Sequence, residues 1–185
     1  TSGYFYGNNV VGIARIGTSY AIKIFNLDGS MQFEDEIDSF ARITSAAHFQ
    51  NKLFYSDDKN YFYIKGEKTR KFNSNHKGLI TRILPVGNYI STISQDKTIK
   101  LWTIKGEELL TLISRPDGEW AVIATNGQFD KSVQFTGMYW VKGQEIIELD
   151  QFFDDFYSPG LLSQVYQTGE LDETRSLDDA LKQVI

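Results

Sequence analysis

A histidine, two hydroxyl side chains and an aspartate lie close together near the middle of this 185-residue sequence. His76 is followed by Thr92 and Ser94 and then by Asp96, which are the residue types of a Ser-His-Asp triad. Such a triad requires an exposed hydroxyl oxygen, a base within hydrogen-bonding distance and an oxyanion site beside them. The same residue types can also form a buried network in which every donor is paired. The secondary structure around these residues decides between an exposed triad and a buried network.

Other candidate sites are weaker. His48 lies in the apolar run 46–49, and no second histidine follows at metal-binding spacing, so we expect a core or channel-lining side chain. A calcium loop needs oxygen ligands at alternate positions and a glycine turn. The acidic clusters lack this layout, and we expect solvated turns at 34–38, 57–58 and 154–155. No glycine-rich phosphate loop occurs. We therefore expect no metal site and no cofactor.

The composition favours a sheet protein. Aromatic residues make up 14% of the chain and suit half-buried pleated surfaces. The chain has no cysteine, which excludes disulfides, thiolate metal ligands and cysteine nucleophiles. This is compatible with the cytoplasm, where we expect the protein. The net charge of −5 disfavours nucleic acid as a partner. No apolar run approaches the roughly 18 residues of a membrane span, so we expect no membrane partner either.

Strand endings that combine an aromatic residue with a glycine recur at an almost constant interval. The aromatic positions are Phe25, Tyr63, Trp102 and Trp140, separated by 38, 39 and 38 residues. Such a period is typical of a propeller blade made of four strands. Short apolar-alternating runs separated by turn residues fill each interval. We expect strands at 10–15, 20–26, 31–33, 45–49, 52–56, 61–65, 69–72, 80–84, 89–94, 99–104, 108–112, 120–125, 134–141 and 145–149.

The third repeat carries the sharpest motif. Its residues 76–78, His-Lys-Gly, and 90–102, Ile-Ser-Thr-Ile-Ser-Gln-Asp-Lys-Thr-Ile-Lys-Leu-Trp, closely resemble a WD40 repeat. In that family a His, a Ser or Thr, an Asp and a Trp form one hydrogen-bonded chain inside the blade. The resemblance implies a structural tetrad of His76, Thr92 (or Ser94), Asp96 and Trp102, and no catalytic role for these residues.

The other repeats depart from this pattern. Thr103 stands where the WD40 motif ends in Asp. We expect Asp57 to match Asp96 in the second repeat, whereas Ser19 and Gln134 occupy that position in the first and fourth.

The C-terminal part carries a second resemblance. Residues 115–132, which include Asp-Gly-Glu-Trp, and residues 148–162 are similar to the closing repeat of bacterial WD-repeat proteins, several of which carry a caspase-like domain upstream. This implies a C-terminal position in a larger chain, as does the absence of a starting methionine before strand-like residues 4–6. Aromatics at helical spacing predict helices after about residue 150, ending at Gly169. Ser176 and Asp179 resemble a capping box for a last helix.

We therefore expect an all-β, WD40-like β-propeller of about four blades with a short helical C-terminal tail. The blades are expected at approximately 1–37, 38–74, 75–113 and 114–149, and the tail at 150–185. Most WD-type rings hold about seven blades, so the ring is expected to be partial or closed by an oligomer.

The leading functional hypothesis is a non-catalytic scaffold that binds a protein or peptide, as the sensory or regulatory end of a larger bacterial protein. One alternative is a propeller hydrolase with carboxylates at the channel mouth. Its sign would be convergence of acidic or basic residues from different blades at one end of the channel. Residues 94–96, Ser-Gln-Asp, begin like a sialidase box, but Trp102 falls too late. Another alternative is a structural repeat that closes an oligomer.

Overall fold

The computed structural model describes residues 2–142 and 145–172, in two compact units that span Thr1–Glu107 and Glu108–Ile185. The units are described one at a time. Both are built mainly from antiparallel strands joined by short turns. The fold class is all-β with propeller-like sheets and short helices near the C-terminus, as the sequence predicts. The division at Glu107 falls inside the expected third blade, and the expected blade boundaries remain a prediction.

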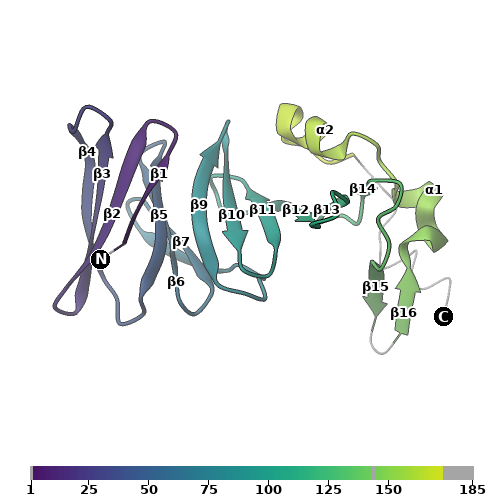
Figure 1. Ribbon diagram of the computed structural model, residues 1–185, viewed down its shortest axis with the longest axis horizontal. Coiled ribbons are helices and arrows are strands. Elements are labelled where there is room, and N and C mark those ends of the chain that lie inside the picture. The colour runs from purple at the N-terminus through teal and green to yellow at the C-terminus, as the bar shows by residue number, and fades with distance from the viewer. Residues whose placement is uncertain (1, 143–144, 173–185) are drawn as a thin grey trace. The chain divides into compact units, whose positions relative to one another are not determined.

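Within each sheet of the first unit, strands that follow one another in the chain pair, which gives up-and-down sheets lying side by side in Figure 1. The first sheet contains β1 (Ser2–Tyr6), β2 (Asn9–Ile16), β3 (Ser19–Asn26) and β4 (Met31–Asp38). The second contains β5 (Ile43–Phe49), β6 (Lys52–Asp57), β7 (Tyr61–Lys65) and β8 (Thr69–Asn73). The third sheet begins with β9 (Ile80–Val86), β10 (Tyr89–Ser94) and β11 (Thr98–Trp102).

The second sheet is buried on both faces because neighbouring residues of a pleated strand point to opposite sides. Along β6, Leu53 and Tyr55 pack in a core shared with the first sheet. Phe54, between them in sequence, packs in the core shared with the third sheet. Phe54 and Phe62 are fully buried, and each contributes about 1.5–3 kcal/mol by leaving water.

The periodic aromatic residues occupy equivalent faces of their sheets. Trp102 packs toward the second sheet, and Tyr63 packs toward the first. Phe25 follows Ile24 in β3, and Ile24 belongs to the core between the first two sheets, so Phe25 lies on the opposite face. In these three repeats the aromatic residue therefore faces the side of the preceding sheet. Around Phe25 that side is open, since Phe5 on the same face is 72% exposed.

The second unit combines three strands paired in chain order, a hairpin and the helices. Its strands are β12 (Glu108–Ser114), β13 (Trp120–Ala124), β14 (Phe129–Lys131), β15 (Tyr139–Lys142) and β16 (Glu145–Glu148). The 3-10 helix η1 (Leu149–Phe152) and the α-helices α1 (Phe153–Phe156) and α2 (Leu161–Thr168) follow. Phe129 of β14 packs with Phe152 and Phe156, so the aromatic spacing of the tail serves a local core.

Most expected strands of the first unit are confirmed to within a few residues, but the strand at 134–141 is wrong. Residues 132–138 form a turn and irregular chain, and a strand begins only at Tyr139. Gly137 has a φ of +80°, a left-handed conformation that interrupts a strand. Strand β14 was not expected, because Phe129–Lys131 is too short to show an alternating pattern.

The helical tail is confirmed over its described part. Helix α2 buries Leu161 and Val165, and it ends at Gly169, whose left-handed backbone N–H bonds to the carbonyl of Val165. The proposed capping box at Ser176 and Asp179 lies outside the described residues. None of the helices described here combines the length and apolar character needed to span a bilayer.

Candidate functional site

The structure brings His76, Thr92, Asp96 and Trp102 together at one side of the third sheet. The Trp102 indole N–H donates to the Thr92 hydroxyl oxygen at 2.9 Å. The same oxygen lies 2.8 Å from Nε2 of His76. On the other side of the ring, Nδ1 of His76 lies 3.3 Å from Oδ2 of Asp96. Strand register explains the first contact. Thr92 pairs with Lys100, which precedes Trp102 by two residues on the same face of the β10–β11 hairpin, so Thr92 and Trp102 are diagonal neighbours.

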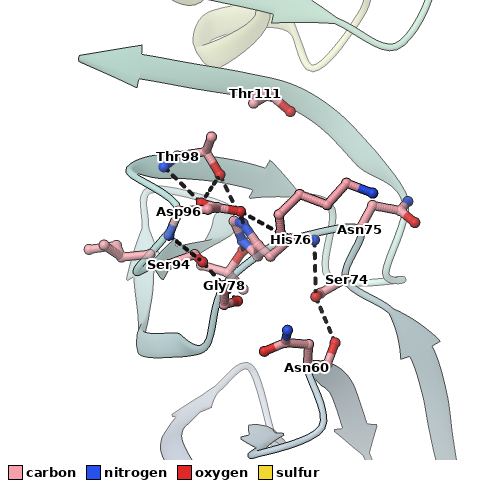
Figure 2. Close-up of polar contacts among 12 residues, drawn as sticks. Asn60, Ser74, Asn75, His76, Gly78, Ser94, Asp96, Thr98 and Thr111 are labelled. Atoms are coloured by element: carbon pink, nitrogen blue, oxygen red, sulfur yellow. Dashed lines mark hydrogen bonds and ion pairs between the residues drawn. The ribbon is translucent and has the colours of Figure 1, made fainter. Parts of the chain in front are cut away.

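A fifth member of the network, Thr98, was missed by sequence analysis. Its hydroxyl donates to Asp96 Oδ1 at 2.7 Å and lies 2.9 Å from Nδ1 of His76, as Figure 2 shows. The backbone N–H of Thr98 also donates to Asp96. An aspartate in a turn commonly accepts the N–H two residues further on. The Asp-x-Thr spacing was the available signal.

The donors and acceptors of this network fit a neutral histidine. An indole N–H can only donate, so the Thr92 oxygen accepts from Trp102 and its own proton is available for His76 Nε2. Because the Thr98 hydroxyl donates to Asp96, its oxygen can accept from a proton on His76 Nδ1. Proton placement is assigned here from these constraints.

The Asp96 carboxylate is held in its charged form. Burial by itself raises the pKa of a carboxyl group, but here it is outweighed by hydrogen bonds from the Thr98 hydroxyl and from the backbone of Lys77 and Thr98, with a smaller effect of His76. The net result is a pKa well below the usual range. The Lys77 N–H to Oδ2 bond is only 2.6 Å long, which is typical of a charged acceptor.

Ser94, the alternative hydroxyl, has a different role. It donates to the carbonyl of Gly78 at 2.9 Å and accepts from the backbone N–H of Asp96, which fixes the turn. Gly78 is required by the close approach of this turn, because a Cβ there would lie 2.7 Å from the Asp96 nitrogen. The His-Lys-Gly segment and the Asp96 turn are therefore held together by backbone contact as well as by His76 (Figure 2).

The expectation that Asp57 matches Asp96 is wrong, because Asp57 takes the place of Ser94. Each is the last residue of its strand, and each side chain accepts from the backbone N–H two residues on. Each carbonyl also accepts from the left-handed residue three positions on, Asn60 in one turn and Lys97 in the other. The turns after β6 and β10 therefore have the same geometry. Lys59 stands at the position of Asp96, so the second sheet cannot repeat the tetrad.

The second sheet instead pairs Asp57 with tyrosines. Tyr63 donates its hydroxyl to Asp57 Oδ2 at 2.8 Å, and the Asp57 side chain is buried. Burial and the bond to Asp57 raise the pKa of Tyr63 well above its usual value. Burial and the charge of Asp57 raise the pKa of Tyr55, which stacks on Tyr63 with ring centroids 4.7 Å apart, to about 12. Both phenols therefore stay neutral, and Tyr63 acts as the donor to Asp57.

A second polar chain, also missed from the sequence, links the first strands of the three sheets. The Tyr4 hydroxyl of β1 contacts Ser45 of β5 at 2.7 Å, and it bonds to the backbone N–H and carbonyl of Ala46. Ser45 in turn accepts the backbone N–H of Ile83 in β9 at 2.9 Å. These contacts join residues about 40 positions apart, so no local pattern could reveal them.

A cavity of about 440 Å³ opens beside this chain, where β5 and β9 begin and β2 ends. Its lining includes Ile13, Ile43 and Ile80, and three exposed arginines, Arg15, Arg42 and Arg82. One arginine comes from each of the first and third sheets, and Arg42 immediately precedes β5 of the second. Sequence analysis missed all three, because each arginine alone reads as a solvated surface residue.

The remaining histidine shows no sign of a ligand role. His48 stacks on Phe33 with ring centroids 4.1 Å apart, and partial burial lowers its pKa. Within residues 2–142 and 145–172, no cluster of three or more His, Asp or Glu side chains could hold a metal ion.

No protein-family model matches this sequence, and no curated protein matches it either. Among solved structures, the chain is similar to the computationally designed Ika8 protein, with 18% identity, a TM-score of 0.45 and coverage of 80% of this chain and 54% of that one. The WD40 β-propeller domain of Doa1 gives 14% identity and a TM-score of 0.43, over 76% and 50% of the two chains. HIRA(644-1017) gives 11% and 0.40, over 65% and 47%.

The chain thus spans about half the length of each of these structures. The propeller-like fold of this protein is assigned from the order and antiparallel pairing of its own strands.

Proposed function

We propose that this protein is a non-catalytic propeller scaffold that binds a protein or peptide partner at the end of the sheets where β5 and β9 begin. The observation that carries the proposal is the burial of the one network with triad-like chemistry. Thr92 is fully buried, and its oxygen is already bonded to His76 and Trp102. A substrate carbonyl cannot reach that oxygen, so the network supports a structural role for His76, Thr92, Asp96 and Trp102.

The hydrolase alternative predicts acidic or basic side chains converging from different blades. Arginines do converge at the cavity, from three successive repeats. An arginine side chain stays protonated in proteins and cannot act as a general base, whereas it binds anionic groups well. The convergence therefore supports recognition over hydrolysis.

The open face of the first sheet supports a partial ring that requires a neighbour. That face carries a row of cross-strand neighbours, Phe5, Val10 and Phe25. In the second and third sheets, the corresponding face packs against the preceding sheet. Phe5 is exposed and Val10 and Phe25 are partly buried, and a partly exposed apolar row of this kind favours association. Preceding blades of a longer chain, or a second copy of this one, would cover it in the proposed assembly.

The proposal includes a place in a larger protein. The resemblance of residues 115–132 and 148–162 to bacterial WD-repeat proteins suggests a cytoplasmic regulatory propeller that follows an effector domain, such as a caspase-like one. Reading the gene upstream of Thr1 tests this part directly. An in-frame effector domain is the expected result, and its absence overturns the regulatory role without affecting the scaffold.

Selection from a phage-displayed random peptide library tests the scaffold function. We expect enriched peptides whose binding is weakened by Arg42→Gln, or by Ser2→Tyr, which puts a bulky side chain at an exposed position of the cavity lining. Circular dichroism should be unchanged in both variants. Failure to enrich any peptide, or binding that ignores both substitutions, would overturn the proposed contact surface.

A further inference from the structure

We infer that the cavity lined by Arg15, Arg42 and Arg82 is an anion-binding site that recognises the carboxylates of an acidic peptide segment. The inference rests on the proposed scaffold function and names the chemistry of its ligand. It follows from the charge, the placement and the surroundings of these three guanidinium groups.

The concentration of positive charge is unexpected for this chain. The protein carries a net charge of −5, yet the lining of the cavity contains three arginines and no acidic side chain. Among the described residues, the acidic partners in ion pairs belong to Lys23 and Lys65, and no such pair neutralises an arginine of the cavity. Like charges gathered without a counter-charge are costly, and a bound anion removes that cost.

Two of the guanidinium groups are held in place before any ligand arrives. Arg82 lies over the Tyr4 ring, with its Cζ 4.7 Å from the ring centroid, and its Nη1 donates to the carbonyl of Thr81. Tyr4 is itself fixed by Ser45 and Ala46. Arg15 donates from Nε to the carbonyl of Gly17 in the β2–β3 turn. Fixing these side chains in advance lowers the entropy lost on binding.

The nitrogens of Arg15 and Arg82 that are not used in these bonds keep the forked geometry that matches a carboxylate. The cavity volume lies within the range of about 300–1,000 Å³ typical of ligand sites. Its apolar floor of isoleucines suits the aliphatic stem of a glutamate better than a fully hydrated inorganic ion. A short peptide with several glutamates is the ligand that fits best.

Fluorescence anisotropy with a labelled Glu-rich peptide tests the inference on the whole chain. The Glu-rich peptide should bind, and its counterpart with Gln at every Glu position should bind at least about tenfold more weakly. Arg42→Gln and Arg82→Gln should each weaken binding of the Glu-rich peptide by about tenfold or more. Added salt should weaken it further, because exposed charges are screened.

Lys68→Gln is the matched control, because it removes one positive charge from an exposed turn outside the cavity. It should leave the affinity within about twofold. Equal loss in Lys68→Gln and Arg42→Gln would show a general charge effect and overturn the site. A phosphoserine peptide that binds while the Glu-rich one does not would overturn the carboxylate assignment.

Failure of the inference can be separated from failure of the scaffold function. If library selection yields neutral peptides that are blocked by Ser2→Tyr but not by the arginine substitutions, the anion site is wrong and the scaffold stands. If selection yields no peptide and the Glu-rich peptide does not bind, both are wrong.

Discussion

Replacing Thr92 with valine tests whether the buried network stabilises the fold. Valine has nearly the same shape as threonine, so the change removes the hydroxyl without opening a cavity. The Trp102 indole N–H and Nε2 of His76 each lose a partner, at 2.9 Å and 2.8 Å respectively. Trp102 is only 2% exposed, and the His76 side chain is fully buried, so water cannot replace the lost bonds.

Leaving a buried polar group unpaired costs about 1–3 kcal/mol, and two groups lose a partner, so Thr92→Val should lower the free energy of unfolding by about 2–6 kcal/mol. This loss is a large fraction of the free energy of unfolding of a typical domain, which is about 5–15 kcal/mol. Urea unfolding followed by circular dichroism measures the loss. Hydrogen exchange of the Trp102 indole proton, followed by NMR, reports on the same site directly, and it should become faster.

Thr69→Val is the matched control, because Thr69 is exposed on β8, and its free energy of unfolding should change by no more than about 0.5 kcal/mol. A double-mutant cycle with Trp102→Phe isolates the Thr92–Trp102 interaction from the cavity that the smaller ring leaves. Equal stability of Thr92→Val and Thr69→Val, or a coupling energy of zero, would refute the reasoning.

Three further predictions follow from named contacts. The lowered pKa of Asp96 stabilises the fold at pH values above the unfolded pKa of about 4, and this stabilisation is lost as the pH falls toward the folded pKa. The free energy of unfolding of Asp96→Asn should therefore fall less than that of the parent protein over this pH range. Identical acid profiles would contradict the assignment. Tyr63→Phe leaves the buried Asp57 carboxylate without one donor, so urea unfolding should show a loss of about 1–3 kcal/mol; an unchanged midpoint would speak against that bond. Phe5→Glu puts a charge on the open face of the first sheet and should lower self-association in light scattering coupled to size-exclusion chromatography; a monomer both before and after the change would exclude closure by a second copy.

Local patterns in the sequence predicted most of the strands, and the resemblance of one repeat to WD40 supplied the four residues of the tetrad. Alternation of apolar and polar residues fixes which strand faces are buried, and hairpin register then brings Thr92 beside Trp102. All four tetrad residues come from one repeat, so their meeting depends on contacts within a single sheet. The periodic aromatics were also readable, because each of the first three repeats places one on the same face of a pleated sheet.

Tertiary structure alone decided which residues meet between sheets. The hydroxyl chain from Tyr4 through Ser45 to Ile83 and the gathering of Arg15 with Arg82 both join separate repeats. No sequence pattern encodes such contacts, because they depend on how one sheet face stacks on the next. The Asp57 position was misjudged because an aspartate suits several positions of a turn, and only the backbone hydrogen bonds show that Asp57 stands at the Ser94 position.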